Sequence, residues 1–218
     1  SLSIRTKTHV SLLIQMTATI QYSKTKKTRT NQMNMIQTMQ QQTSTTTQFL
    51  FDLESTGLLR QGSRIHCLVM RNLIDSDTLV FDHRPEQAVI QGVKQLENAD
   101  VLVGHNIIGY DIPLLKERFP DFSPKGQAID TLVLSRLFYP HIADRDFERR
   151  PIGMPQRLYG RHSLEAWGYR LKCFKGDYGK GPDAWDKYTP EMLSYCIQDT
   201  EVTLKLYQLM QRRMEDYS

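Results

Sequence analysis

The sequence predicts an α/β fold in which helices flank a mixed β-sheet. Two observations support this: short apolar runs separated by turns begin at residue 48, and helical and strand patterns alternate after them. The first runs, residues 49–53, 64–70 and 78–81, are predicted strands, divided by the glycines near residues 57–62 and by the acidic turn at residues 75–77. Three early strands followed by this alternation predict helices on both faces of one sheet.

The later elements follow from helical spacing and from capping residues. Residues 85–98 are a predicted helix, because Pro85 suits a first turn and Val89, Val93 and Leu96 recur on one face. Residues 101–103 are a predicted fourth strand. Further helices are expected at residues 111–119, 130–138, 162–171 and 189–214. In the last of these, Thr189 is the expected N-cap and Pro190 the first helical residue.

Three segments lack such patterns. Residues 140–161 and 172–188 are rich in Gly, Pro and charge and are expected to be long loops, which in compact domains are usually functional or mobile. Residues 1–46 are rich in Thr, Ser, Gln and Asn and lack Gly and Pro, which predicts a disordered tail. The expected organisation is therefore a tail at residues 1–46 and one domain at residues 47–218.

Composition narrows the class of protein. The 218 residues carry a formal charge of +4, but residues 1–51 hold six basic side chains and no acid, so the excess belongs to the expected tail. No apolar run approaches the roughly 20 residues of a membrane-spanning helix. The scattered Cys67, Cys173 and Cys196 form no CxxC pair, which disfavours a disulfide framework or a zinc site and favours a reducing, cytoplasmic setting. Organellar targeting by the basic tail is the alternative.

A pair of carboxylates stands on the first predicted strand. Asp52 and Glu54 are two residues apart, so both side chains leave the same face of the sheet. Burying two like charges costs solvation energy unless a cation compensates them, which points to a metal site. Acidic residues also commonly end strands, so this pair alone is weak evidence.

Two further acids follow at later elements. Asp111 comes directly after the fourth strand at the start of a helix, where an ordinary dipole-stabilised aspartate is the alternative. Tyr195 and Asp199 are four residues apart, which places phenol and carboxylate on one helical face; a surface aspartate beside a core tyrosine is the alternative there. The order DxE, NxxxYD and YxxxD is a combination that chance rarely supplies.

With these motifs the chain resembles the DEDDy branch of the DnaQ-like 3′-to-5′ exonucleases, from about residue 48 to its end. Residues 129–137 (IDTLVLSRL) and 162–171 (HSLEAWGYRL) look like the proofreading exonuclease domain of short-tailed-phage family A DNA polymerases. The resemblance implies a ribonuclease H-like fold and removal of mononucleotides from single-stranded or mispaired DNA 3′ ends. It also implies two Mg²⁺ ions, with Mn²⁺ as a substitute.

The same resemblance implies roles for matching residues. Asp52, Glu54 and Asp199 would hold a first metal, with Asp52 bridging to a second whose hydration shell Asp111 steadies. Tyr195 would orient the attacking water. The positions that would contact the terminal nucleotide are Thr56, Leu58 and Asn106, although burial in a loop is equally open for Leu58. Asp130 is read as a helix cap rather than as a fifth ligand.

Some questions stay open at this point. Between residues 145 and 180 nine basic residues stand against four acidic ones, which favours a strand-tracking basic rim or simply solvated loops. The expected partners are a DNA 3′ terminus and a polymerase domain in cis or in trans. A DEDDy exoribonuclease and a non-catalytic polymerase-binding module are the alternative functions. No polymerase activity is expected from this chain, which is either stand-alone or a piece of a polymerase.

Overall fold

The computed structural model describes residues 46–57, 63–173, 178 and 183–216. The expected tail at residues 1–46 therefore falls almost wholly outside the described residues, as does Leu58. The compact unit that contains the sheet begins at Thr47.

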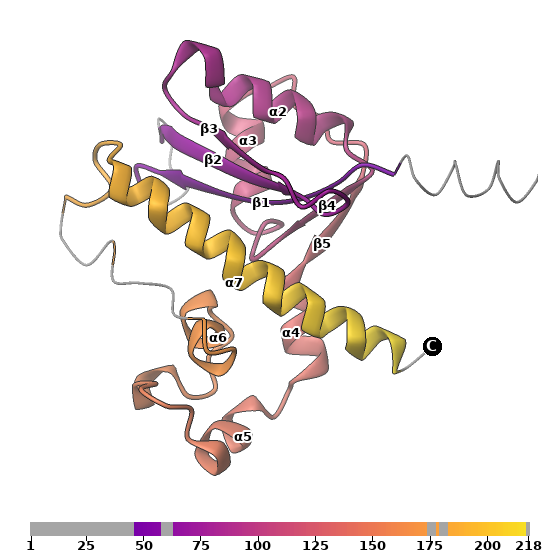
Figure 1. Cartoon of the computed structure of the whole chain (residues 1–218), viewed down its shortest axis with the longest axis vertical. Helices are drawn as coiled ribbons and strands as arrows, with labels where there is room; N and C mark the ends of the chain where they lie inside the picture. Colours follow the sequence, from indigo (N-terminus) through magenta and orange to yellow (C-terminus); the bar gives the residue numbers. More distant parts are fainter. Residues whose placement is uncertain (1–45, 58–62, 174–177, 179–182, 217–218) are drawn as a thin grey trace, which may run out of the picture. The chain divides into compact units, whose positions relative to one another are not determined.

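A five-stranded sheet forms the centre of this unit, in the order β3-β2-β1-β4-β5 (Figure 1). The strands are β1 (Gln48–Ser55), β2 (Ile65–Asn72), β3 (Thr78–Phe81), β4 (Val101–Gly104) and β5 (Gln127–Asp130). The strands β1, β2 and β3 are antiparallel neighbours, whereas β4 runs parallel to β1 and β5 parallel to β4. The predicted mixed sheet is confirmed.

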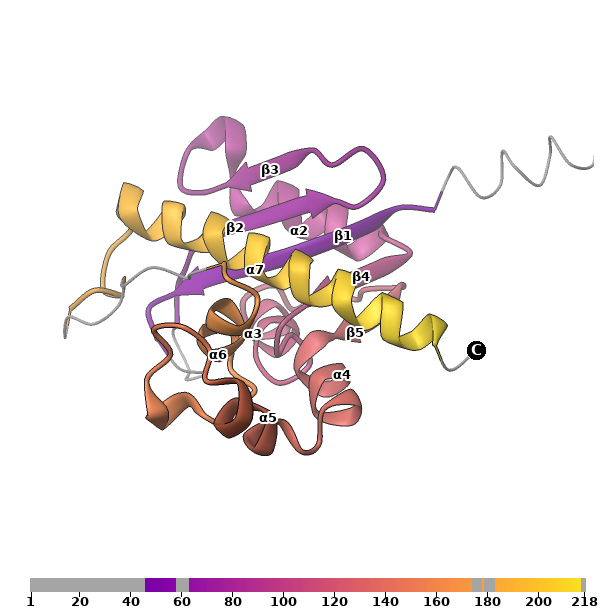
Figure 2. The same ribbon diagram turned by 60° about the horizontal axis from the view of Figure 1, so that its bottom comes forward.

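Helices cover both faces of the sheet. They are α2 (Val89–Asn98), α3 (Asp111–Arg118), α4 (Thr131–Phe138), α5 (Ile142–Arg149), α6 (Leu164–Arg170) and α7 (Pro190–Glu215), with single 3₁₀ turns at Pro85–Gln87 and Gln156–Leu158. In Figures 1 and 2, α4, α5 and α6 lie on the side of α7 away from β2 and β3. The ribonuclease H-like arrangement of a mixed sheet between helical layers is confirmed.

The two faces of β1 belong to different layers. Phe49, Phe51 and Leu53 pack with α2 and α3 in the main core. Between them, Leu50 turns to the other face and contacts Tyr207 of α7. Since side chains alternate along a strand, Asp52 and Glu54 also point to the α7 side.

Two predictions about the middle of the chain were incomplete. Residues 127–130 form the edge strand β5, which the sequence did not indicate, so α4 begins at residue 131 rather than 130. Residues 140–161 are not one long loop, because they contain α5 and the turn at Gln156–Leu158. The buried positions of α5 are Ile142 and Asp146, one turn apart. Because Asp146 is charged, these positions do not form the apolar repeat from which a helix is predicted.

Within the described residues, no helix is both long and apolar enough to cross a membrane.

Candidate metal and nucleic-acid site

Strand β1 carries the first two acids of the site. It pairs with β2 along its length but with β4 only at Gln48–Leu50, so the part holding Asp52 and Glu54 has one strand neighbour. The register shifts between Glu54 and Ser55. Such bulges bend a strand and redirect side chains, and they are frequent next to functional sites. Only 8% of Glu54 is exposed, whereas Asp52 is half-buried.

Helix α7 brings the second group of residues to the same face. Thr189 caps its first turn by accepting a hydrogen bond from the Met192 N–H, as predicted, and Pro190 follows. Asp199 is buried with 4% exposed, and Tyr195 is half-buried one turn earlier. The Tyr195 ring lies 5.6 Å from Tyr178 and 5.9 Å from Trp185, centroid to centroid. These rings limit where the phenol can turn.

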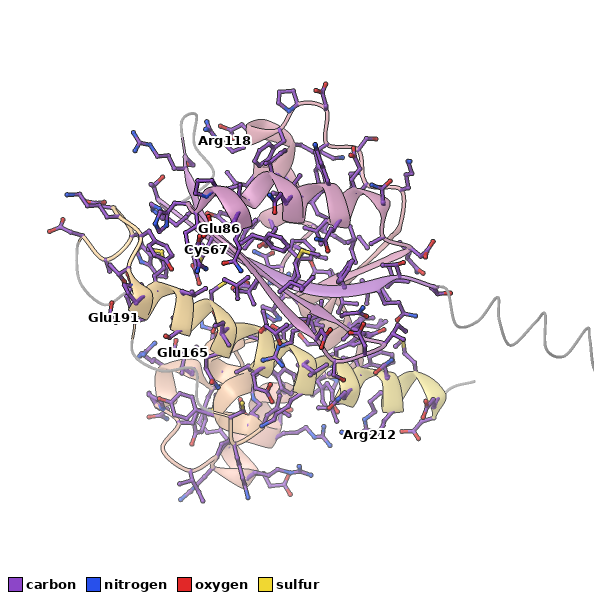
Figure 3. All side chains as sticks on the ribbon, turned by 45° about the horizontal axis from the view of Figure 1, so that its top comes forward. Cys67, Glu86, Arg118, Glu165, Glu191 and Arg212 are labelled. Atoms are coloured by element: carbon purple, nitrogen blue, oxygen red, sulfur yellow. The ribbon has the colours of Figure 1, made fainter. Side chains whose placement is uncertain are left out.

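One residue at this site was not singled out from the sequence. Ligand atoms of Asp52, Glu54 and Cys196 all lie within 4.8 Å of one another, a spacing that a single metal ion could bridge. The Cys196 Sγ is 3.5 Å from Asp52 Oδ2. Burial, contact with the Cys67 thiol and the nearby carboxylates raise the pKa of the Cys196 thiol. Figure 3 labels Cys67 of β2, whose side chain packs with that of Cys196 of α7.

Asp111 approaches β1 from the β4 side. It is the first residue of α3, and the backbone N–H groups of Asp111 itself and of Leu53, the residue between Asp52 and Glu54, act on its carboxylate to lower its pKa. Only 3% of Asp111 is exposed. Desolvation by burial raises the pKa of this carboxyl to about 7, and the charge of Asp130 adds to the shift. Asp111 and Asp199 fall outside this group of Asp52, Glu54 and Cys196; both are buried, Asp111 at the start of α3 and Asp199 on α7.

Asp130 holds the loop between β4 and α3. As predicted, it caps α4 by accepting a hydrogen bond from the Leu132 N–H. It also accepts the backbone N–H groups of Asn106 at 2.8 Å and Ile108 at 3.1 Å. Asn106 is exposed and adopts a left-handed conformation with φ of 66°, which asparagine tolerates better than most residues. The loop that presents Asn106 is thus fixed by a buried carboxylate.

Gly104 permits the close approach that starts this loop. A Cβ at Gly104 would lie 2.2 Å from the Ile107 side chain and 2.9 Å from the Phe51 carbonyl oxygen. No other residue fits between β4 and β1 without displacing backbone.

The turn after β1 is held by a second tyrosine. The Tyr110 hydroxyl hydrogen-bonds Ser55 Oγ at 2.6 Å and donates to the Gly57 carbonyl oxygen. Thr56 pairs with Arg64 through its backbone N–H and through its Oγ1, which accepts the Arg64 N–H at 3.0 Å. Tyr110 therefore ties the Asp111 loop to the segment of Thr56. The sequence signal for it was present, since Tyr110 immediately precedes Asp111.

Comparison with known proteins gives two kinds of similarity. The chain is 31% identical to the DNA-directed DNA polymerase of Enterobacteria phage T3 over 179 residues, and 30% identical to that of Escherichia phage T7 over 177 residues. Each match covers 71% of this chain and 25% of the polymerase, so the chain spans about a quarter of the relatives' length. No protein-family model matches the sequence.

The predicted resemblance to phage DNA polymerases is confirmed by these two relatives. Solved structures agree in fold: Brucella melitensis NrnC has a TM-score of 0.54 and 17% identity, covering 80% of this chain and 76% of its own. The EXO domain of Aedes aegypti Nibbler has a TM-score of 0.53 and 14% identity, covering 83% and 85%. Escherichia coli RNase D, described as an exoribonuclease, has a TM-score of 0.51 and 12% identity, covering 78% and 40%. At these identities the structures support the fold alone.

Proposed function

We propose that this chain is a metal-dependent 3′-to-5′ exonuclease that acts on DNA 3′ ends. The observation that carries the proposal is the meeting of β1 with α7: Asp52 and Glu54 point to the helix that bears Tyr195 and Asp199. Asp111, at the start of α3, lies near enough to β1 for the Leu53 backbone N–H to lower its pKa. The acids that the motifs singled out thus stand on β1 or at α7 and α3, which pack on its two faces.

The residues fit a divalent cation. Glu54, Asp111 and Asp199 are each at least nine-tenths buried, and a ligand oxygen of Asp52 lies within 4.8 Å of one of Glu54. Burying carboxylates is unfavourable for their ionised forms unless a cation balances the charge. Desolvation by burial, with the charge of Asp130, raises the pKa of Asp111 for this reason. Carboxylate oxygens are ligands that Mg²⁺ and Mn²⁺ prefer. We propose two such ions, bound by Asp52, Glu54, Asp111 and Asp199.

Bound cations would supply Lewis-acid activation of a phosphodiester and charge stabilisation of its leaving oxygen. The chain's own residues do the positioning. Tyr195, with a phenol whose ordinary pKa is near 10, donates or accepts a hydrogen bond to orient the attacking water and does not act as the base. Asn106 and Thr56 stand on the two loops that Asp130 and Tyr110 fix, and they would contact the terminal nucleotide together with Leu58.

DNA is the proposed substrate because the sequence similarity is to two DNA polymerases. An exoribonuclease is the second candidate, supported by the fold shared with RNase D. A polymerase domain, in cis or in trans, is the proposed partner, and this chain itself is not proposed to polymerise.

The test is cleavage of 5′-labelled 20-mers: single-stranded DNA, duplex DNA with a matched or mismatched 3′ end, and RNA. We expect stepwise shortening with Mg²⁺ or Mn²⁺ and none with chelator. Single-stranded and mismatched ends should be cut at least tenfold faster than matched ends, because freeing each base-pair step costs about 1.4 kcal/mol. Equal rates on matched and single-stranded DNA would contradict the substrate, and faster cleavage of RNA would select the ribonuclease.

A further inference from the structure

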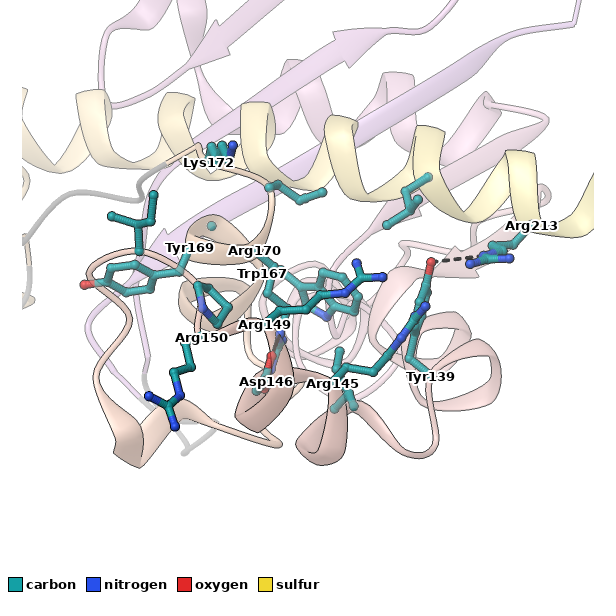
Figure 4. Close-up of a pocket in the computed structure, with 16 residues that line it drawn as sticks. Tyr139, Arg145, Asp146, Arg149, Arg150, Trp167, Tyr169, Arg170, Lys172 and Arg213 are labelled. Atoms are coloured by element: carbon teal, nitrogen blue, oxygen red, sulfur yellow. Dashed lines mark hydrogen bonds and ion pairs between the residues drawn. The ribbon is translucent and has the colours of Figure 1, made fainter.

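A second site of different chemistry lies between α5, α6 and α7. A pocket of about 880 Å³ opens there, within the range that holds a nucleotide-sized ligand. Its lining includes six basic side chains, from the helix ends and the segments after them, and a single carboxylate, Asp146. Figure 4 shows Arg149 and Arg170 beside Trp167 and Arg213 beside Tyr139, with Arg150 and Lys172 farther out. The basic residues are Arg145, Arg149, Arg150, Arg170, Lys172 and Arg213.

Local pairing accounts for only part of this charge. Arg170 donates to both oxygens of Asp146, at 2.9 and 2.6 Å, and these two charges cancel. Arg213 lies 3.5 Å from the Asp216 carboxylate, which offsets a second positive charge. The pocket lining also includes residues at the carboxyl ends of α5, α6 and α7, and each helix end contributes roughly half a negative charge. Roughly two positive charges remain in excess after the ion pairs and the helix dipoles are counted. The pocket is therefore a site for an anion.

The aromatic residues of the pocket add a second, independent feature. Trp167 is 3% exposed, and its Nε1–H is buried with no acceptor among the described residues. An unsatisfied buried donor costs on the order of 1–3 kcal/mol. If the side chains that cover this nitrogen move aside, a phosphate oxygen in the pocket supplies the missing acceptor. The Tyr139 ring contacts the Trp167 ring. The guanidinium groups of Arg145 and Arg213 lie 5.1 Å and 5.5 Å from the Tyr139 ring centroid.

Two of the basic residues stand where helices end. Arg150, after α5, and Lys172, after α6, both have positive φ, of 47° and 54°, a common conformation for the residue that ends a helix. Both side chains line the pocket.

We propose that this basic pocket binds the phosphate backbone of the substrate strand upstream of the cleaved end. The inference rests on the proposed exonuclease function. Arg213 lies fourteen residues beyond Asp199 on α7, which is roughly 21 Å along the helix. Figure 3 labels Arg212 next to it, at the opposite end of α7 from Glu191. At about 3.4 Å per stacked nucleotide, that distance corresponds to roughly six nucleotides.

The proposal predicts that affinity depends on strand length. A strand of sixteen deoxythymidylates, dT16, reaches both sites, whereas dT3 reaches one. We expect fluorescence anisotropy with labelled strands, in chelator so that no cleavage occurs, to give at least tenfold tighter binding of dT16 than of dT3.

The variant pair is Arg145→Gln with Arg149→Gln, on α5. It should weaken dT16 binding about tenfold, leave dT3 within twofold, and reduce the slope of log affinity against log salt by about 1.4, since each lost phosphate contact removes about 0.7. The matched control is Lys94→Gln with Lys116→Gln, exposed lysines of α2 and α3 on the other face of the sheet. It should change dT16 binding less than twofold.

Trp167→Phe isolates the indole donor, because it keeps a ring in the core and removes the N–H. It should weaken dT16 binding several-fold without changing the salt slope. Equal effects of the two double variants, or equal binding of dT3 and dT16 by the wild type, would overturn the pocket as a strand site. Absence of cleavage with Mg²⁺ would instead overturn the exonuclease, and binding in chelator tests the pocket either way.

Discussion

The two faces of β1 carry opposite chemistry within eight residues. One face presents Phe49, Phe51 and Leu53 to α2 and α3, and it lies in the main apolar core. The other begins with Leu50 against Tyr207 and continues with Asp52 and Glu54 beside Cys196. A ribonuclease H-like sheet can therefore support a charged site. The apolar face of β1, packed in the core, stabilises a strand whose other face holds acids that repel one another.

Removing the acids is expected to have the largest effect. Asp52→Ala with Glu54→Ala should lower cleavage of single-stranded DNA a thousand-fold or more, about 4 kcal/mol in barrier, because the metal ligands are lost. In chelator, the double variant should be at least as stable as the metal-free wild type, since repulsion between the two carboxylates disappears. Timed gel assays and thermal melts in chelator measure the two quantities.

The matched control removes two exposed acids, Glu117 and Asp121, near the end of α3. It should change neither cleavage nor stability appreciably. Full activity in the β1 double variant would show that the catalytic site lies elsewhere.

A substitution on the opposite face should separate stability from catalysis. Phe51 is fully buried, so Phe51→Ala should cost about 3–5 kcal/mol of unfolding free energy through lost burial and a residual cavity. Urea unfolding measures this loss. Cleavage per folded molecule, assayed well below the melting temperature, should fall far less than in the acid variant. A thousand-fold loss of activity there would mean that the two faces do not act separately.

Tyr195→Phe is expected to be milder than loss of the acids. It removes one hydrogen bond of about 1–3 kcal/mol to the attacking water, so kcat should fall roughly ten- to hundred-fold while Mg²⁺ affinity is unchanged. Tyr178→Phe is the matched control, because the Tyr178 ring contacts the Tyr195 ring at a tilt and its hydroxyl donates to the Ala184 carbonyl oxygen instead. A loss as large as that of the acid variant would assign the phenol a greater role.

The raised pKa of Asp111 predicts a pH dependence of stability. In the metal-free folded protein this carboxyl has a pKa of about 7, above its ordinary value of 3.8, so the folded state binds more protons than the unfolded state between these limits. Metal-free stability should therefore fall as pH rises from about 4 to 7, and stabilisation by Mg²⁺ should grow over the same range. Asp111→Asn should flatten this dependence. Thermal melts at pH 5 and 8, with and without Mg²⁺, test both statements.

The sequence predicted most of the sheet because alternation along β1 and β2 is strong and turns separate the strands. It did not reveal β5, whose four residues lie at the sheet edge directly before a helix, where local pattern cannot mark the change. Helix α5 was not predicted because its buried face includes a charged residue, Asp146. The burial of Asp146 depends on its ion pair with Arg170 of α6. Local periodicity cannot anticipate such a partner.

The candidate site, too, was only partly predictable from the sequence. The shared face of Asp52 and Glu54 follows from a period of two, and the pairing of Tyr195 with Asp199 from a helical turn. Cys196 could not be foreseen as their neighbour, because its position depends on how α7 is rotated over the sheet. The clamp of Asp130 on the Asn106 loop likewise depends on β4 and β5 being adjacent.

Cys196 offers the smallest expected effect with Mg²⁺ and the finest test of the site. Its Sγ lies 3.5 Å from Asp52 Oδ2, yet burial raises the pKa of the thiol, so it stays protonated and is a poor ligand for a hard cation. Cys196→Ser should therefore keep Mg²⁺-dependent cleavage within about threefold.

Thiophilic ions behave differently, because a soft ion stabilises the thiolate and could be held by sulfur and the two carboxylates together. Micromolar Cd²⁺ should inhibit the wild type and inhibit Cys196→Ser much less. Cys173→Ser, a buried cysteine that packs with Leu164 and Val202, is the matched control and should stay as sensitive as the wild type. Equal Cd²⁺ inhibition of all three proteins would show that sulfur does not contact the metal, and that the ion acts through the carboxylates alone.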